Sequence, residues 1–197
     1  MPHPVLLLMH GFMSDEADLL ALGQELLPDV AIVSVRAPIA MSPGYSWFEF
    51  QNGMQPDPIT LDKSLTAVEE IIGQLHTIVP HADPSRLLIG GFSQGGAMTA
   101  ALACRRRGRG ILGAMVLSGY LPDYVCQTET LSGLPLFWGH GRADPVIPVS
   151  RAEIGSERFR SAGARVTFRP YPTGHSVTPQ EIDDINQWMS PLLGPQG

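Results

Sequence analysis

Charged side chains are scarce in this chain of 197 residues, at 16% of the total, and basic residues are the scarcer kind. The 13 lysines and arginines face 19 aspartates and glutamates, so the formal net charge is −6. Because nucleic acid is itself a polyanion, this balance argues against nucleic acid as a partner. One basic run, residues 105–109, ends a predicted helix, where cations suit the helix dipole. We expect a solvated helix end there rather than a phosphate site.

Long apolar runs are also missing. No stretch approaches the ~18 consecutive apolar residues that span a bilayer, and residues 4–9 are too short, and lack the charged flank, for a signal peptide. The two cysteines, Cys104 and Cys126, suggest neither a disulfide framework nor a metal site by their spacing. We therefore expect reduced thiols, a cytoplasmic location and no stable membrane insertion. The apolar share of 44% predicts one sizeable core and a single domain over residues 1–197.

Apolar runs of strand length alternate with helix-like patterns along the chain. Ser14 or Asp15 is expected to cap the first helix, and Pro28 follows its end. Buried strands that alternate with helices predict a doubly wound, mostly parallel α/β sheet, and the proline-rich residues 38–58 are expected to be irregular. The predicted strands are residues 5–9, 31–35, 86–92, 112–118, 136–139 and 165–171, and the predicted helices are residues 16–27, 61–79, 94–107, 150–162 and 179–189.

The strongest functional signal is the sequence GFSQG at residues 91–95. It joins the third predicted strand to a helix, which is the context in which G-x-S-x-G forms a nucleophile elbow. In so tight a turn, a Cβ at Gly91 or Gly95 would clash with the neighbouring strand or helix. The turn exposes the Ser93 hydroxyl beside a helix N-terminus, which favours negative charge. Ser93 is therefore the candidate nucleophile.

A serine nucleophile needs a base within hydrogen-bond reach and an acid that orients the base. Because ligands gather at the carboxyl ends of parallel strands, both groups are expected just after strands. Asp144 and His175 follow the fifth and sixth strands and give the order serine, acid, histidine that this architecture favours. Asp123, after the fourth strand, is a competing acid. His140 does not complete that order, so we expect it to have a structural or supporting role.

Acyl transfer also needs donors for a developing oxyanion. One donor is expected to be the backbone N–H of Gln94, the residue after the nucleophile. The other is expected from the loop after the first strand, where His10-Gly11-Phe12 offers the backbone N–H of Phe12. Gly11 lets the backbone approach closely.

Four blocks of this sequence resemble the phospholipase/carboxylesterase branch of the α/β-hydrolases, which includes acyl-protein thioesterases and bacterial carboxylesterases. The blocks are LMHGF at residues 8–12, GGFSQGG at 90–96, HGRADPVIP at 140–148 and GH at 174–175. The resemblance spans nearly the whole chain, and the second and third blocks are specific. It implies a single-domain α/β-hydrolase without a metal or an organic cofactor. The site residues that it implies are the triad Ser93, Asp144 and His175 and the oxyanion donors Phe12 and Gln94.

The chain departs from the family pattern in two places. Its first predicted strand has no antiparallel hairpin before it, so we expect six parallel strands in the order 2-1-3-4-5-6 and no separate lid domain. Where the family commonly has H-G-x-G-D, this chain has Met13 in place of the second glycine and its acid, Asp15, one position later. We expect this change to reshape the oxyanion loop and narrow the entrance.

Residues 36–38 and 45–48 resemble the stretch that lines the family's acyl pocket. The predicted lining of a shallow apolar groove is Met13, Tyr45, Trp47, Phe48 and Met54, and core packing is the alternative for each of them. A shallow groove favours short to medium acyl chains. The sequence thus predicts a serine carboxylesterase that acts on a small-molecule ester, with no indication of its oligomeric state. The alternatives are an acyl-protein thioesterase or lysophospholipase, and a catalytically silent binding module.

Overall fold

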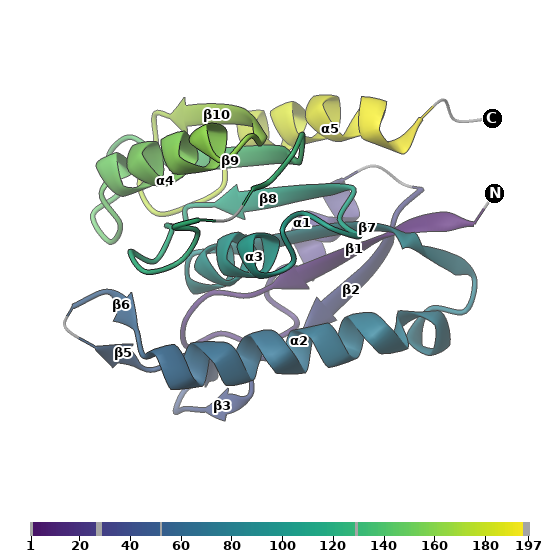
Figure 1. Cartoon of the computed structure of the whole chain (residues 1–197), viewed down its shortest axis with the longest axis horizontal. Helices are drawn as coiled ribbons and strands as arrows, with labels where there is room; N and C mark the ends of the chain where they lie inside the picture. Colours follow the sequence, from purple (N-terminus) through teal and green to yellow (C-terminus); the bar gives the residue numbers. More distant parts are fainter. Residues whose placement is uncertain (1, 27–28, 52, 129, 195–197) are drawn as a thin grey trace.

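A six-stranded parallel sheet organises the computed structural model, which describes residues 2–26, 29–51, 53–128 and 130–194 (Figure 1). Every pairing between neighbouring strands of this sheet is parallel. The order across the sheet is β2-β1-β7-β8-β9-β10, which confirms the predicted order 2-1-3-4-5-6. The strands are β1 (His3–Met9), β2 (Ala31–Val35), β7 (Ala82–Phe92), β8 (Gly113–Leu117), β9 (Pro135–Gly141) and β10 (Arg165–Tyr171).

The strand β1 shows why the sheet needs cover on both faces. Its residues from Val5 to Met9 are all fully buried. Val5 and Leu7 belong to one core cluster, whereas Leu6 and Leu8 belong to the other. Because successive side chains of a strand point to opposite faces, an unbroken apolar run is typical of a strand buried on both sides.

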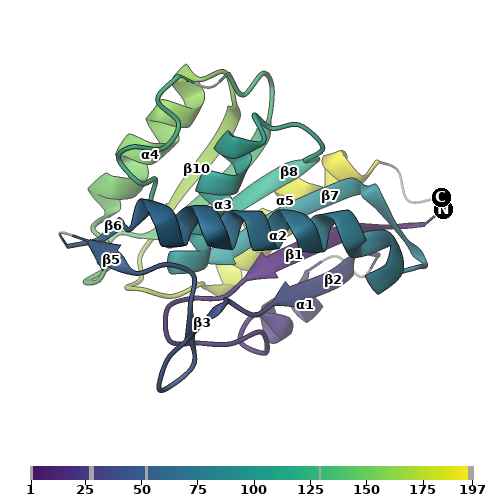
Figure 2. The same ribbon diagram turned by 60° about the horizontal axis from the view of Figure 1, so that its bottom comes forward.

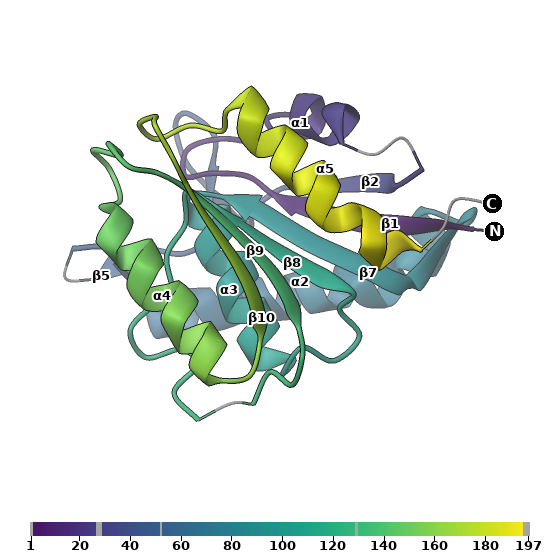
Figure 3. The ribbon, with the colours of Figure 1, turned by 90° about the horizontal axis from the view of Figure 1, so that it is seen from above.

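Helices supply that cover (Figure 3). One face carries α2 (Pro58–Ile78), α3 (Gln94–Arg105) and α4 (Val149–Ser161), and the other carries α1 (Leu20–Glu25) and α5 (Pro179–Leu193). Figure 2 brings α2 to the front, where it crosses the parallel strands and packs on α3. Among the helices of the described ranges, none is both long and apolar enough to cross a bilayer.

The first helix is shorter than the predicted range of residues 16–27. In the structure α1 spans Leu20–Glu25, and no side chain caps its start, so neither predicted cap is correct. The Asp15 carboxylate instead accepts a hydrogen bond from the Ala17 N–H at 2.9 Å. This local turn satisfies the backbone without a helix and delays the helix start. Residues 27–28, at the predicted helix end, lie outside the described residues.

The stretch expected to be irregular contains two short antiparallel ribbons. In one, β3 (Ile39–Ala40) pairs with β4 (Tyr45–Ser46), and in the other β5 (Phe50–Gln51) pairs with β6 (Gln55–Pro56). The helix α2 then begins three residues earlier than predicted. The carboxylate of Asp57 caps it by accepting the Thr60 N–H at 2.8 Å, and Pro58 suits the first helical turn.

The expectation of reduced thiols is wrong. Cys104 in the last turn of α3 and Cys126 in the connection from β8 to β9 form a disulfide, with their Cα atoms 5.4 Å apart. The bond exists because that connection folds back onto α3, which the spacing of two cysteines in the sequence could not show. The expected cytoplasmic location drew on reduced thiols and loses that support.

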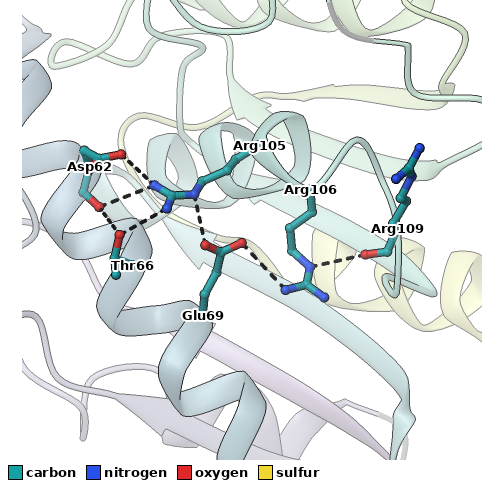
Figure 4. Close-up of polar contacts among 6 residues, drawn as sticks. All are labelled: Asp62, Thr66, Glu69, Arg105, Arg106 and Arg109. Carbon is teal, nitrogen blue, oxygen red and sulfur yellow. Dashed lines mark hydrogen bonds and ion pairs between the residues drawn. The ribbon is translucent and has the colours of Figure 1, made fainter.

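Two arginines of the basic run tie α3 to α2 (Figure 4). Arg105 lies 2.7 Å from Asp62 Oδ1 and 2.9 Å from Glu69 Oε2, and it also donates to Thr66 Oγ1 at 3.1 Å. Arg106 lies 3.7 Å from Glu69 Oε1. These pairs are partly exposed and add little stability each, but they favour the predicted helix-end role over a phosphate site.

Candidate active site

Ser93 lies in a strained turn between β7 and α3. Its φ of 55° and ψ of −113° belong to a region that non-glycine residues rarely adopt. A Cβ on Gly91 would lie 2.3 Å from the Gly95 carbonyl oxygen, and a Cβ on Gly95 would lie 1.9 Å from that of Met9. Both distances are far inside van der Waals contact, so the predicted need for the two glycines is confirmed. The elbow and α3 approach β1 more closely than any side chain would allow.

A chain of hydrogen bonds connects Ser93 to His175 and Asp144. The Nε2 atom of His175 lies 2.9 Å from Ser93 Oγ, and its Nδ1 lies 2.7 Å from Asp144 Oδ2. An ionised carboxylate only accepts hydrogen bonds, so Nδ1 carries a proton and Nε2 accepts from the serine hydroxyl. The ring of Phe92 packs against the imidazole, with centroids 4.8 Å apart. This arrangement can transfer a proton from the hydroxyl to the ring.

The Asp144 carboxylate is buried but well supplied with donors. Its Oδ1 accepts the backbone N–H groups of Val146 at 2.8 Å and Ile147 at 2.9 Å. Burial opposes ionisation, but the hydrogen bonds from His175 and from these two amides outweigh it and lower the pKa of Asp144. The carboxylate is therefore charged at neutral pH and can stabilise an imidazolium beside it.

Backbone hydrogen bonds join the loops that carry Asp144 and His175. The Arg142 N–H donates to the Tyr171 carbonyl at 2.8 Å, and the Ala143 N–H donates to the Thr173 carbonyl at 3.0 Å. These bonds continue the pairing of β9 with β10 beyond the carboxyl ends of the two strands. The spacing between the acid and the histidine is thus set by the main chain.

His140 lies beside Asp144, whereas Asp123 is engaged elsewhere. The buried His140 ring donates from Nε2 to the Ile147 carbonyl at 2.8 Å, and the same nitrogen lies 3.4 Å from Asp144 Oδ2. Burial lowers the pKa of His140, which opposes a charge on it. This position fits the predicted supporting role. The Asp123 carboxylate is exposed and accepts a hydrogen bond from Gln55 Nε2 at 2.8 Å.

The backbone N–H groups of the two candidate oxyanion donors make no hydrogen bond to the described residues. Phe12 and Gln94 both line a cavity with Ser93. The Phe12 N–H donates to no residue in the described part of the chain, and the Gln94 N–H, at the start of α3, has no intrahelical acceptor. The Gln94 side chain is occupied, because it accepts the Trp47 N–H and donates to the Phe48 carbonyl, each at 2.9 Å. It therefore anchors the segment after β4.

The cavity beside Ser93 has a volume of about 300 Å³ and a largely apolar lining. Among the described residues, Met54 is the one member of the predicted acyl groove that lines it. The other lining residues are Phe12, Phe50, Gly53, Ser93, Gln94, Tyr120, Val146 and Ile147.

The remaining predicted groove residues lie elsewhere. Trp47 and Phe48 are 1% and 0% exposed and pack in the main core, and the Trp47 indole donates to the His10 carbonyl at 2.9 Å. Met13 is 40% exposed, and its N–H donates to the Tyr45 carbonyl at 2.9 Å, which holds β4 to the loop after β1. Core packing, the alternative for each residue, is correct for Trp47 and Phe48.

Sequence reasoning missed Phe50 and Tyr120. Phe50 packs edge-on against Phe12, with ring centroids 5.3 Å apart. The Tyr120 hydroxyl donates to the Met54 carbonyl, and burial raises the pKa of Tyr120. The strand β5 has only two residues, too few for alternation along a strand to show which way Phe50 faces. Tyr120 comes from the connection after β8 and carries no local signal of its position.

The parallel sheet, its order and the helices on both faces define the protein as an α/β-hydrolase by fold. The candidate elbow lies at the carboxyl end of β7, where ligands gather in such sheets. The chain belongs to the Phospholipase/Carboxylesterase family, whose family model matches residues 1–193.

Several known proteins are similar to this chain. Acyl-protein thioesterase 1 of Gibberella zeae is 36% identical over 119 residues, which cover 57% of this chain and 51% of that protein. A probable carboxylesterase of Oryza sativa subsp. japonica is 31% identical over 152 residues, which cover 73% and 57%. The chain thus spans little more than half the length of these curated relatives. A Bacillus cereus carboxylesterase crystal structure shares the fold, with a TM-score of 0.87, 24% identity and coverage of 96% and 89%.

Proposed function

We propose that the protein is a serine carboxylesterase that hydrolyses small-molecule esters of short to medium acyl chain. The observation that carries this proposal is the hydrogen-bonded chain from Ser93 through His175 to Asp144. Ser93, the first residue of this hydrogen-bonded series, lines an apolar cavity, so an ester carbonyl that enters the cavity meets the Ser93 hydroxyl. The family membership agrees with ester chemistry.

In the proposed reaction, Ser93 Oγ attacks the ester carbonyl while Nε2 of His175 takes its proton. The charged Asp144 stabilises the imidazolium that forms, and the N–H groups of Phe12 and Gln94 bind the oxyanion. His175 then protonates the leaving alcohol, and an acyl-enzyme remains. Water attacks this acyl group with the same base, and the acid and the free serine are released.

The cavity supports the limit on acyl length. Its volume of about 300 Å³ lies at the small end of the roughly 300–1,000 Å³ that is typical of ligand pockets. The hydrogen bond between Tyr120 and Met54 joins two of its walls. A short or medium acyl chain fills this space, whereas a long chain extends out of it.

A thioesterase is the second candidate, since several relatives are named acyl-protein thioesterase. The same acyl carbonyl is attacked, and only the leaving group differs. A panel of matched esters, thioesters and lysophospholipids separates these activities, because the preferred class shows the highest kcat/KM. A silent binding module would react with no member of the panel and would resist labelling of Ser93 by a fluorophosphonate.

The decisive variant is Ser93→Ala, assayed on p-nitrophenyl esters. We expect kcat to fall by at least about 10³-fold, with an unchanged thermal unfolding midpoint. Hydrolysis at a near wild-type rate would exclude the proposed nucleophile. For the wild type, rates across acyl chains from acetate to palmitate are expected to peak at short to medium length. A maximum at palmitate would contradict the assignment of the cavity.

A further inference from the structure

We propose that His10 is a positioning residue that aims the Phe12 N–H at the oxyanion. The inference rests on the oxyanion role proposed above for Phe12. His10 follows β1 directly, and its side chain is fully buried. Both ring nitrogens of His10 bond to backbone groups and not to Ser93, His175 or Asp144, so His10 acts through the backbone.

The hydrogen bonds of His10 define its tautomer. The Ala37 N–H donates to Nε2 at 3.1 Å. A backbone N–H can only donate, so Nε2 is the acceptor and the ring proton resides on Nδ1. The Nδ1 atom lies 2.7 Å from the Gly11 carbonyl oxygen, to which it donates. The ring is therefore neutral, with both nitrogens in use.

This bond orients the peptide between Gly11 and Phe12. Among the described residues, the one cis peptide bond is Ser42–Pro43, so this peptide is trans. In a planar trans peptide the C=O and the N–H point in opposite directions. Holding the Gly11 carbonyl on the buried ring therefore turns the Phe12 N–H away from the ring. A Cβ on Gly11 would lie 3.6 Å from Ser93 Cβ, so the peptide lies beside the nucleophile.

The anchor is needed because the residue before this peptide bond is a glycine. Glycine adopts many backbone conformations at little cost, so an unanchored Gly11–Phe12 peptide can rotate. The Ser14 N–H also donates to the Gly11 carbonyl, but at 3.3 Å this bond is longer than the one from His10. His10 therefore makes the closer of the two contacts.

The same framework includes the second oxyanion donor. The Trp47 indole donates to the His10 carbonyl at 2.9 Å, and the Trp47 N–H donates to the Gln94 side chain at 2.9 Å. The rings of His10 and Trp47 also pack together, with centroids 5.4 Å apart. Gln94 and the Phe12 peptide thus belong to one connected set of buried hydrogen bonds, which fixes the two donors relative to each other.

The test compares His10→Asn with His10→Gln. The amide N–H of asparagine can reach the place of Nδ1 and donate to Gly11, whereas the glutamine amide reaches the place of Nε2. For His10→Gln we expect a fall in kcat of about 10- to 100-fold with KM within about two-fold, since a displaced donor acts on the transition state. His10→Asn is expected to retain most of kcat. Affinity for a trifluoromethyl ketone, which forms a serine-bound oxyanion, should fall in parallel with kcat. Equal losses in both variants, an unaffected His10→Gln, or a lower kcat with unchanged inhibitor affinity would overturn the assignment.

A second measurement uses the wild-type protein and needs no variant to fold. Nitrogen-15 NMR of the histidine rings is expected to show His10 as the neutral tautomer with its proton on Nδ1. A proton on Nε2 would overturn the proposal for His10 alone. Hydrolysis by Ser93→Ala would instead remove the proposed nucleophile and leave the tautomer unchanged, so the two failures can be told apart.

Discussion

Asp144 and Glu181 are both buried carboxyl groups, yet their pKa values move in opposite directions. Asp144 is 8% exposed, accepts hydrogen bonds from His175 and two backbone amides, and has a lowered pKa. Glu181 is 0% exposed, and neither of its carboxyl oxygens makes a hydrogen bond of normal geometry with a described residue. Burial raises the pKa of Glu181 to about 8, and the nearby Thr178 N–H opposes this rise without cancelling it.

The comparison shows that enough hydrogen-bond donors can outweigh burial and keep a buried carboxyl group charged. Asp144 begins a turn in which successive N–H groups converge on its side chain. Glu181, in the first turn of α5, packs against the backbone of Gly139 in β9. Its neighbour Asp184, which accepts the Tyr171 hydroxyl at 2.8 Å, adds a repulsive negative charge. Asp144 is therefore ionised beside His175, as the proposed mechanism requires, whereas Glu181 remains protonated at neutral pH and packs in the interior.

The largest effect is expected from Asp144→Asn. An amide cannot stabilise an imidazolium, and its NH2 group favours the wrong tautomer of His175. The corresponding change in a serine protease lowers kcat by about 10⁴-fold, and we expect a loss of about 10³- to 10⁴-fold here. Steady-state hydrolysis of a p-nitrophenyl ester measures it.

The matched control is Asp123→Asn, which changes the competing acid in the same way. Its carboxylate is exposed and pairs with Gln55 and Arg151. We expect kcat to stay within about two-fold of the wild type, since surface pairs contribute little. Equal losses of kcat in Asp144→Asn and Asp123→Asn would show that Asp144 is not the acid that supports His175.

A smaller effect, on stability, is expected from Glu181→Gln. The folded pKa of about 8 lies above the ordinary 4.5, so the folded state holds a proton that the unfolded state releases between these values. The free energy of unfolding of the wild type should therefore fall as the pH rises through this window, by up to about 5 kcal/mol. Glutamine does not titrate, so this slope should be lost. Urea unfolding at several pH values between about 5 and 9 measures the slope.

The same variant sharpens the contrast with Asp144 in activity. We expect Glu181→Gln to keep kcat within about two-fold at neutral pH, since the wild-type side chain is already uncharged there. Glu153→Gln, which changes an exposed glutamate of α4, is the control for general charge effects. If the free energy of unfolding had the same pH dependence in the wild type and in both variants, Glu181 would be ionised in the folded protein.

The smallest effect is expected from Thr178→Ala. Thr178 Oγ1 accepts the Glu181 N–H at 3.2 Å and caps α5. Its loss should lower the free energy of unfolding by about 1 kcal/mol. Guanidinium unfolding at fixed pH provides the measurement. An unchanged midpoint would mean that packing of Glu181 alone holds the helix start.

Local patterns explain what could be predicted from the sequence. The unbroken apolar run of β1 identifies a strand buried on both faces, and the two glycines around Ser93 identify a turn without room for side chains. The positions of Asp144 and His175 just after apolar runs followed from the same reasoning. In each case neighbours along the chain carry the information.

Contacts between distant segments explain what could not be predicted. The Cys104–Cys126 bond and the place of Tyr120 in the cavity both depend on how the connection after β8 folds back. Trp47 is in the core because Gln94 and His10 bind it there, and an aromatic residue in a loop carries no mark of that. The burial of Glu181 could not be predicted from the sequence for the same reason, since acids in a first helical turn are usually solvated.

The wide spacing of the Ser93, His175 and Asp144 chain has a consequence for how the protein matures. Ser93 and His175 are 82 positions apart, and Asp144 and His175 are 31 apart. Contacts over such distances form after local ones, because more chain entropy must be lost. During synthesis the elbow emerges long before His175, which follows the edge strand β10. Under the proposed mechanism, a nascent or truncated chain therefore holds Ser93 without its base, and we expect ester hydrolysis only after the last strand of the sheet has joined.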